Sequence, residues 1–430
     1  MKILPAESPL RGSFSIPGDK SISHRGVILG SLANGTTELS GFLQSEDCLH
    51  TRECFSQMGI ESHLDDKGTL MIHGKGLLGL TKPKERLYVG NSGTAIRLLS
   101  GVLAAQPFSS SIEGDESIAQ RPMKRVIDPL QSMGAKIESQ GGLAPLIFQP
   151  SELKGIDYKM PVASAQVKSC LLLASLYSKG QTHIHEPHPS RDHTEKMFKK
   201  FGIDILSSEQ GVIFSSQKQN LREISGQKLD IPGDISSAAF FIVAALLTPN
   251  SSLTLKNIGI NKTRRGIVDV LLKMGANIKI TEKEGAFEPV ADLTVEYSEL
   301  KPIDIQGSVI ANLIDEIPIL AVALSHAKGT SHIRDARELR VKESDRIKSI
   351  VQMLQGIGGQ VEEYEDGMCI TGGKPLRGGQ VKTFMDHRIA MSSAVAALTS
   401  SEGVQIDDIA CIKTSFPSFF DIYNQIQERA

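Results

Sequence analysis

Tryptophan is absent from this sequence, and its five cysteines are scattered, with no C-x-x-C pair among them. An odd, dispersed set of cysteines fits a reducing compartment and gives no support for a zinc site or a disulfide framework. The sequence also has no H-E-x-x-H motif and no G-x-S-x-G motif. We therefore expect no bound metal and no serine-hydrolase chemistry.

The chain also lacks an excess of positive charge, with 47 Lys and Arg against 49 Asp and Glu. A dedicated nucleic-acid-binding protein is expected to be more basic, so any anion site must come from locally placed cations. The longest apolar runs, such as 238–247, are shorter than the roughly 18 residues that a membrane span needs. The first residues lack the apolar segment of a signal peptide. We expect a cytoplasmic protein without a nucleic-acid or membrane partner.

What the sequence does contain is an internal repeat. One type of segment is rich in Ala and Ser, starts polar, turns apolar and ends at a turn before a β-like run. Six such segments begin at Lys20, Asn91, Ala163, Asp234, Ala311 and Asp386. Between them lie charged amphipathic helices, each of which is stopped by a glycine and followed by a strand. Five copies of this second segment occupy 51–62, 125–139, 194–206, 267–280 and 347–362.

Each repeat therefore predicts a strand, a buried helix, a strand, a charged outer helix and a further strand. At about 150 residues per domain, 430 residues suggest two to three domains. We place three repeats in a domain at 20–232 and three in a discontinuous domain at 1–19 plus 233–430. The unmatched N-terminal strand could complete the sixth repeat. A solenoid scaffold is the alternative, although its repeats would be shorter.

The repeats differ most at the first turns of their buried helices, where free N–H groups attract anions. Lys20, Ser21 and Arg25 could contact one phosphate or carboxylate together, or they could simply be a capped helix start with solvated cations. The segment is not a P-loop, because Asp19 separates Gly18 from Lys20.

Two further motifs have the same character. In the segment 90–97, Gly93 allows a ligand close to the backbone, while Asn91 and Thr94 can cap or donate. Arg121 follows next and could hold a carboxylate or phosphate by two parallel hydrogen bonds. For the segment 90–97 the competing interpretation is a plain turn, and for Arg121 it is a solvated basic helix start. Other groups suited to a polyhydroxylated anion are Ser164, Gln166, Lys168 and Arg191; His193 is expected at the surface.

Acid–base candidates come from the second half of the chain. Asp315 and Glu316 lie in an otherwise apolar stretch, where a carboxylate is costly to bury without a partner. Pro318 suggests that the helix starts near this pair. Asp315 is thus a candidate base, or else a simple cap.

The segment 340–346 alternates opposite charges. Lys342, Glu343 and Arg346 could share one ionised network that sets their proton affinities, or form an ordinary salt-bridged helix. Arg388, which follows Asp386 at the start of the sixth buried helix, adds a cation at the same level.

Taken together and in order, seven motifs between residues 17 and 391 resemble the 5-enolpyruvylshikimate-3-phosphate synthase family (3-phosphoshikimate 1-carboxyvinyltransferases). The motifs are PGDKSISHR, GNSGTAIRLL, QRPMKRV, SAQVKS, RDHTEKM, LRVKESDRI and DHRIAMS. The resemblance implies a two-domain inside-out α/β barrel with six βαβαββ repeats, three per domain, and an active site between the domains. It also implies transfer of the enolpyruvyl group of phosphoenolpyruvate to the 5-hydroxyl of shikimate 3-phosphate, with no cofactor, in a monomer.

The resemblance also assigns roles. Asp315 would accept the 5-hydroxyl proton, and Glu343 and Lys342 would handle the proton at the methylene carbon, with Lys20 also catalytic. The shikimate 3-phosphate site would be Lys20, Ser21, Arg25, Ser164, Ala165, Gln166, Arg191, Asp315 and Lys342. The phosphoenolpyruvate site would be Lys20, Asn91, Gly93, Thr94, Arg121, Gln166, Arg346 and Arg388.

The sequence departs from the family at three points. Many members have a second serine where this chain has Ala165. The family's C-terminal lysine corresponds to Lys413 or Thr414. Gly93 is typical of inhibitor-sensitive members, whereas SAQ and RDHTEKM look like the tolerant class, so glyphosate sensitivity stays open.

The sister family of UDP-N-acetylglucosamine enolpyruvyl transferases usually carries a cysteine before its counterpart of Arg121, and none is present here. A non-catalytic binder of phosphate-rich ligands is the other alternative.

Overall fold

The computed structural model describes residues 1–284 and 287–428, which divide into two compact units. Unit 1 comprises Met1–Pro17 and Pro232–Ala430, and unit 2 comprises Gly18–Ile231. The chain thus passes between the units at two Pro-Gly-Asp segments.

Unit 2 contains three four-stranded sheets, one for each of its repeats. In spatial order the first is β14 (Lys228–Asp230), β3 (Asn34–Ser40), β5 (Leu70–Lys75) and β4 (Glu61–Leu64). The second is β6 (Leu87–Tyr88), β7 (Ser110–Glu113), β9 (Leu143–Gln149) and β8 (Lys136–Gln140). The third is β10 (Asp157–Lys159), β11 (Gln181–His185), β13 (Gly211–Ser215) and β12 (Leu206–Ser208).

Unit 1 also contains three sheets. The first is β2 (Arg11–Ser15), β15 (Ser252–Gly259), β17 (Val290–Glu296) and β16 (Asn277–Lys283). The second is β18 (Gly329–Ile333), β20 (Gly367–Gly372) and β19 (Gln360–Tyr364), and an isolated parallel bridge at Ile305 takes the place of its first strand. The third is β21 (Gly379–Val381), β22 (Val404–Ile406) and β1 (Lys2–Ile3).

The six sheets share one topology. The first strand of a repeat pairs parallel with the second, which pairs antiparallel with the last, as in β10, β11 and β13. Two first strands come from distant parts of the chain, because β14 completes the first repeat and β2 completes the fourth. The N-terminal strand β1 pairs with β22, so it completes the sixth repeat as the sequence predicts.

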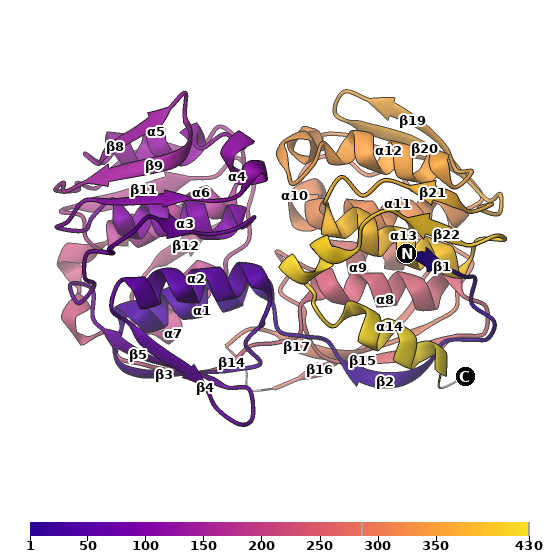
Figure 1. The fold of residues 1–430 in the computed structure, drawn as a ribbon, viewed down its shortest axis with the longest axis horizontal. Coiled ribbons are helices and arrows are strands. Elements are labelled where there is room, and N and C mark those ends of the chain that lie inside the picture. Colours follow the sequence, from indigo (N-terminus) through magenta and orange to yellow (C-terminus); the bar gives the residue numbers. More distant parts are fainter. Residues whose placement is uncertain (285–286, 429–430) are drawn as a thin grey trace. The chain divides into compact units, whose positions relative to one another are not determined.

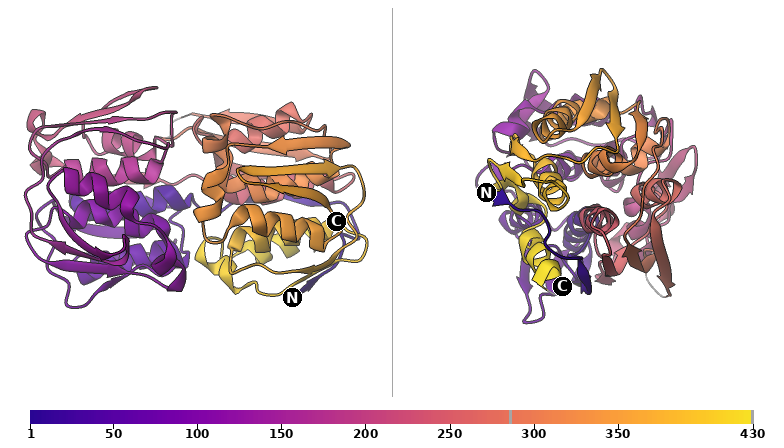
Figure 2. Two further views of the ribbon diagram at one scale, coloured as in Figure 1. Left: turned by 90° about the horizontal axis from the view of Figure 1, so that it is seen from above. Right: turned by 90° about the vertical axis from the view of Figure 1, so that its right-hand side faces the viewer.

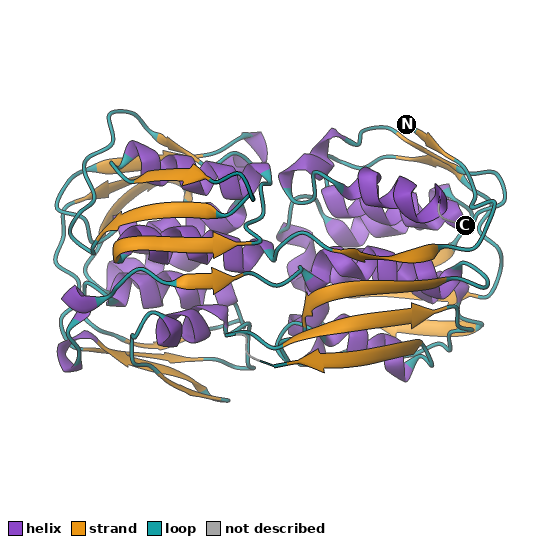
Figure 3. Ribbon diagram, turned by 90° about the horizontal axis from the view of Figure 1, so that it is seen from below, coloured by secondary structure: helices purple, strands orange, loops and turns teal. Residues whose placement is uncertain are grey.

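The helices of each unit fill its interior, and the strands lie outside them (Figures 1 and 3). The right-hand view of Figure 2 looks along the helices of unit 1, which its strands surround. The buried helices are α1 (Lys20–Leu32), α3 (Gly93–Leu103), α6 (Ala165–Ser175), α8 (Ile235–Leu247), α11 (Ile317–His326) and α13 (His387–Leu398). The sheets are open rather than closed into a strand barrel, and the predicted inside-out α/β fold class is confirmed.

Small residues allow these inner helices to approach closely. All of α8 is buried, as is all of α13. At Gly101 of α3, a Cβ atom would lie 2.1 Å from the carbonyl oxygen of Cys170 in α6, so only glycine permits this contact. The prediction that the Ala/Ser-rich segments form the core is therefore confirmed.

The charged helices cover the edges of this core, with one face buried and one exposed. They are α2 (Glu46–Gln57), α5 (Lys124–Ser132), α7 (His193–Lys200), α9 (Gly266–Lys273), α12 (Arg346–Gly356) and α14 (Phe419–Glu428). Shorter elements are α4 (Glu116–Gln120), α10 (Val309–Leu313), η1 (Ser216–Lys218), η2 (Leu221–Glu223), η3 (Ile314–Glu316), η4 (Arg337–Val341) and η5 (Ala410–Thr414).

One helical stretch, Val309–His326, is long and apolar enough by length and composition to cross a membrane, with a mean hydropathy of 1.5. It consists of α10, η3 and α11, and 67% of it is buried inside the protein. Burial of that extent is what a core helix shows. Asp315 and Glu316 interrupt the apolar run at its centre.

Candidate functional site

The first turn of α1 holds a lysine in a fixed position. Asp19 caps the helix, because its Oδ1 accepts the Ile22 N–H at 2.9 Å. Lys20 Nζ lies 2.9 Å from Asp47 Oδ2 on α2, and its side chain keeps 17% of its surface exposed. The ion pair restrains the ammonium group while leaving part of it open to a ligand.

Arg25 lies further along the same helix and is largely buried. Its Nε donates to Thr194 Oγ1 and its Nη2 to Ser169 Oγ, both at 2.7 Å, and its Nη1 donates to the Ser21 carbonyl at 2.8 Å. Arg25 therefore joins α1 to α6 and α7. The sequence motif predicts a cation here but does not reveal this packing role.

His24 connects three helices in the core of unit 2. Its Nδ1 lies 2.7 Å from Thr51 Oγ1 on α2, and its Nε2 lies 3.5 Å from Ser92 Oγ, which caps α3. Burial lowers the pKa of His24 well below its ordinary value, and the positive charges of Lys20 and Arg25 lower it further. The imidazole is consequently neutral.

The hydroxyl groups fix the tautomer of that imidazole. Thr51 Oγ1 donates to the Asp47 carbonyl, so it accepts from His24 Nδ1–H. The remaining ring nitrogen, Nε2, then accepts from the Ser92 hydroxyl. His24 thus ties the first turns of α1 and α3 together without adding charge.

Gly93, the first residue of α3, leaves room for two guanidinium groups. A Cβ atom at this position would lie 3.0 Å from Arg121 Nη1 and 3.3 Å from Arg97 Nη1. Arg121 Nη2 donates to Asn91 Oδ1 at 2.9 Å and to Ser117 Oγ at 3.0 Å. The structure therefore brings Asn91, Gly93 and Arg121 together, as the motifs predict.

Gln166 connects this group to α6. Its Oε1 accepts from Arg97 Nη1 at 2.5 Å, and its Nε2 donates to Thr94 Oγ1 at 2.9 Å. Ser164 caps α6 by accepting the Val167 N–H at 3.4 Å. Arg97 was not among the predicted site residues. The signal that could have found it is a single cation within an otherwise apolar helix.

Two candidates of the third repeat lie deeper than the sequence suggests. Lys168 is 1% exposed, and its Nζ lies 2.8 Å from Glu186 and 2.7 Å from Glu195. Burial alone would lower the pKa of Lys168, but the two carboxylates outweigh burial and raise it, so the ammonium stays charged. The expectation of a surface position for His193 is wrong, because this residue starts α7 on its inner face and is 2% exposed. Arg191 remains half-buried.

In unit 1, the acid–base candidates form one cluster. Asp315 Oδ1 lies 3.0 Å from Lys342 Nζ and 3.4 Å from Arg346 Nη1. Glu343 Oε2 lies 2.5 Å from Arg346 Nη2. Asp315 lies on η3, immediately before α11, as the position of Pro318 predicts. Four candidates separated by up to 31 residues are thus brought together.

Arg346 is the centre of this cluster. Its Nε and Nη2 donate to the two oxygens of Asp386 at 2.8 and 3.3 Å. Burial alone would lower the pKa of Arg346, but Asp386 and Glu343 raise it above its ordinary value, so this guanidinium keeps its charge. Asp386 in turn caps α13 by accepting the Arg388 N–H at 3.0 Å.

The segment before α13 has an unusual backbone. Phe384 and Met385 have φ angles of 54° and 56°, a left-handed conformation that bulky side chains rarely adopt. Both side chains are exposed, at 43% and 70%. Strained backbone of this kind is concentrated at functional sites, and here it positions the capping Asp386.

Arg388 belongs to a second network in unit 1, around the fully buried Glu316. Glu316 Oε1 accepts a short hydrogen bond from the Ser236 hydroxyl and lies 4.0 Å from Arg388 Nη1 and 3.7 Å from Arg264 Nη1. Arg264 Nη2 donates to Ser236 Oγ at 2.7 Å and to Asp234 Oδ1 at 3.2 Å. Ser236 and Arg264 are not among the predicted site residues, although Ser236 lies in the first turn of a buried helix.

The two candidates for the family's C-terminal lysine differ in position. Lys413 is exposed on η5, whereas Thr414 is half-buried. Thr414 Oγ1 lies 3.4 Å from His387 Nδ1, at the start of α13. Of the pair, Thr414 is therefore the residue that faces a buried-helix start.

Each unit thus presents cations and hydroxyls at the first turns of its buried helices, and unit 2 adds the amides of Asn91 and Gln166. Guanidinium and ammonium groups supported by helix N-termini bind phosphate and carboxylate groups. Unit 1 adds two carboxylates, Asp315 and Glu343, in one cluster with an amine, Lys342, which is a combination that proton transfer needs.

Comparisons with known proteins agree with this chemistry. The family model described as EPSP synthase (3-phosphoshikimate 1-carboxyvinyltransferase) matches residues 4–423. A 3-phosphoshikimate 1-carboxyvinyltransferase of Bacillus pumilus is 49% identical over 419 residues, which cover 96% of each chain. The enzyme of that name from Pelobacter propionicus is 48% identical over 434 residues, which cover 100% of this chain and 99% of that one.

Solved structures give the same result. An EPSP synthase from Acinetobacter baumannii is 41% identical, with a TM-score of 0.86 over 99% of this chain and 97% of that one. The enolpyruvyl transferase NikO from Streptomyces tendae shares the fold, with a TM-score of 0.80 at 14% identity over 98% and 96% of the chains. The chain belongs to the EPSP synthase family.

Proposed function

We propose that this protein transfers the enolpyruvyl group of phosphoenolpyruvate to the 5-hydroxyl of shikimate 3-phosphate. The products are 5-enolpyruvylshikimate 3-phosphate and phosphate, in the shikimate pathway that leads to chorismate and the aromatic amino acids. The observation that carries the proposal is the family match over residues 4–423, which includes all seven motifs. The acid–base cluster around Asp315 supports it independently.

In this proposal, the domain at 20–232 mainly binds shikimate 3-phosphate, and the discontinuous domain at 1–19 plus 233–430 provides phosphoenolpyruvate contacts and acid–base groups. The proposed ligands of shikimate 3-phosphate are Lys20, Ser21, Arg25, Ser164, Ala165, Gln166, Arg191, Asp315 and Lys342. The proposed ligands of phosphoenolpyruvate are Lys20, Asn91, Gly93, Thr94, Arg121, Gln166, Arg346 and Arg388. Ala165 would contribute only backbone and methyl contacts.

The cations have a clear physical task. Two anionic substrates repel each other, so a site must supply several positive charges before they can meet. Arg121 and Arg346 are held by protein partners and need little reorganisation when an anion arrives. Fixed orientation then lowers the barrier to a bimolecular addition by up to several kcal/mol.

The reaction proceeds in two proton-coupled steps. In the addition, Asp315 accepts the proton of the 5-hydroxyl as that oxygen attacks C2 of phosphoenolpyruvate, while Glu343 or Lys342 delivers a proton to the methylene carbon. In the elimination, the group that delivered the proton, Glu343 or Lys342, takes a proton back from the new methyl group of the tetrahedral intermediate as the C–O bond to phosphate breaks and phosphate departs. Lys342 lies next to Asp315, where it balances the charge of the carboxylate.

The proposal includes a monomer in the cytoplasm that acts on small molecules alone, without a cofactor, a nucleic acid or a membrane. The homologous proteins are named for a transferase activity between small molecules.

The test measures phosphate released from phosphoenolpyruvate by the purified protein. We expect release only when shikimate 3-phosphate is added, and none with UDP-N-acetylglucosamine. Release with the nucleotide sugar would favour the sister family, and the absence of release with either acceptor would overturn the proposal. The variant Asp315→Asn replaces one side-chain oxygen by an amide nitrogen. It serves as the folded control for phosphate that a contaminating phosphatase releases.

A further inference from the structure

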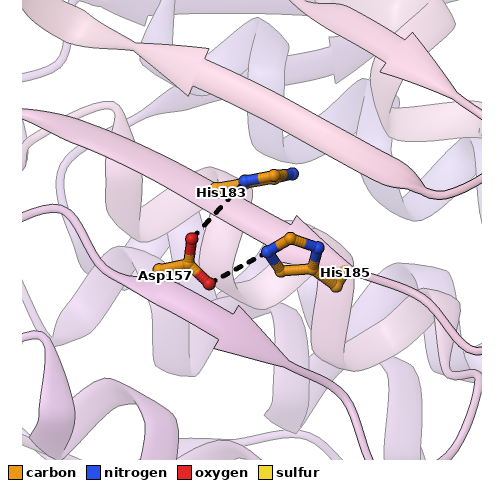
Figure 4. A group of neighbouring side chains, drawn as sticks. All are labelled: Asp157, His183 and His185. Carbon is orange, nitrogen blue, oxygen red and sulfur yellow. Dashed lines mark hydrogen bonds and ion pairs between the residues drawn. The ribbon is translucent and has the colours of Figure 1, made fainter.

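Unit 2 carries a second cluster of titratable side chains, on the sheet of the third repeat and among residues that the proposed reaction does not use. His185 Nε2 lies 2.9 Å from Asp157 Oδ1, and His183 Nδ1 lies 3.5 Å from Asp157 Oδ2. The two imidazole rings pack with centroids 3.7 Å apart. Figure 4 shows both rings converging on one carboxylate.

The fold explains why these residues meet. Side chains two residues apart on a strand point to the same face, so His183 and His185 of β11 form one pair. Thr182, which precedes the pair, and Ile184, which lies between its members, are buried, so the histidines lie on the outer face of the sheet. The edge strand β10 runs parallel to β11 with Asp157 beside His183.

We propose that Asp157, His183 and His185 form a binding site for a divalent transition-metal ion, for which Zn²⁺ is the best match. Two neutral imidazoles and a carboxylate are donors that zinc accepts at about 2.0–2.2 Å. Tetrahedral ligand atoms at that bond length are about 3.3 Å apart. The imidazole nitrogens lie 2.9 and 3.5 Å from two different oxygens of Asp157, so the side chains would have to turn for one oxygen and both nitrogens to share an ion. One ligand atom from each residue lies within 4.8 Å of the others.

The cluster lies where solvent reaches it. The side chains of His183 and His185 are 33% and 32% exposed, and that of Asp157 is 66% exposed, so solvent reaches all three. On the other side of β11, the residue paired with His185 is Gly211, which has no side chain to crowd the ring. A water molecule would complete the four ligands, as in sites with three protein donors.

The sequence predicts no metal, because it contains no H-E-x-x-H motif and no cysteine cluster. The pattern that carries this site is His-x-His on a strand, completed by an aspartate from the neighbouring strand. The ion would cross-link β10 to β11 and so hold the exposed edge of the sheet. It has no part in the transferase reaction.

The competing explanation is a pair of surface ion pairs between Asp157 and protonated histidines, with no affinity for metals. The experiment therefore titrates the full chain, stripped with EDTA and dialysed, with Zn²⁺ alone in a calorimeter. We expect one equivalent to bind to the unaltered protein. The variants His183→Gln, His185→Gln and Asp157→Asn should each weaken binding about tenfold or more.

A matched control comes from another histidine pair in the same unit. His63 and His73 stack with ring centroids 5.6 Å apart on β4 and β5, with no carboxylate ion-paired to either among the described contacts. His63→Gln combined with His73→Gln should leave the binding of Zn²⁺ unchanged. Phosphate release from phosphoenolpyruvate should be the same in all these variants, which also shows that they are folded.

A second measurement uses Co²⁺ as a spectroscopic probe. Visible absorption bands of four-coordinate cobalt with nitrogen and oxygen ligands should appear in the unaltered protein and disappear in His183→Gln. The proposal is overturned if the EDTA-stripped protein binds no Zn²⁺, if the three ligand variants bind as tightly as the unaltered chain, or if cobalt gives no such bands.

Discussion

The buried His24 should make unit 2 less stable in mild acid. The folded protein keeps this imidazole neutral, because burial and the neighbouring Lys20 and Arg25 lower its pKa well below 6.5. The unfolded chain binds a proton there at about pH 6.5. His24 thus contributes stability that is fully present above pH 6.5 and is lost as the pH falls towards the folded-state pKa.

The size of the effect follows from that linkage. Between pH 7 and pH 5, proton uptake by an unfolded histidine of pKa about 6.5 lowers the free energy of unfolding by up to about 2 kcal/mol. Forced protonation would also remove the acceptor for the Ser92 hydroxyl, because an imidazolium has none. The caps of α1 and α3 would then lose their common support.

The assay compares urea unfolding, followed by circular dichroism, at pH 7 and pH 5. Hydrogen exchange of peptides from α1 and α3 reports unit 2 separately, since two units need not unfold together. His24→Asn cannot titrate, so the unaltered protein should lose up to about 2 kcal/mol more than this variant over the interval. The variant His63→Gln, at an exposed position, should lose as much free energy of unfolding between pH 7 and pH 5 as the unaltered protein. Equal losses in the unaltered protein and His24→Asn would refute the reasoning.

Three further predictions concern other contacts. Asp315→Asn should lower kcat about 10²- to 10⁴-fold with shikimate 3-phosphate binding largely retained, measured by steady-state kinetics and calorimetry; unchanged turnover would exclude it as the base. Gly93→Ala should raise KM for phosphoenolpyruvate more than KM for shikimate 3-phosphate, because the new Cβ would lie 3.0 Å from Arg121; equal changes would contradict this. Lys168→Met should lower the free energy of unfolding, measured in urea, by about 3–5 kcal/mol, because it leaves two buried carboxylates without their cation. The control Lys179→Met, at an exposed ion pair, should lower it by less than about 1 kcal/mol.

The repeat architecture could be predicted from the sequence because its signals are local. The alternation of Ala/Ser-rich and charged helices is visible in the order of residues, and Pro318 marks the start of α11 correctly. The motif residues were also correctly expected at helix starts, as Lys20 and Gly93 show. Each of these inferences needs only a few neighbouring positions.

What the sequence could not give depends on partners far along the chain. Lys168 looks like a ligand until Glu186 and Glu195 are seen to neutralise it. Nothing near His193 in the sequence shows that α7 turns this residue inward. Arg97 likewise becomes recognisable only when Gln166, 69 residues away, is placed beside it.

The strand β14 gives the chain an order of assembly during synthesis. The first sheet of unit 2 stays one strand short until residues 228–230 have left the ribosome, although its other strands lie before residue 76. The N-terminal segment must wait still longer, because β2 pairs with β15, which begins at residue 252. The N-terminal strand of a nascent chain therefore stays unpaired while the whole of unit 2 is synthesised. Truncation just before residue 228 would leave an open sheet edge, which favours aggregation.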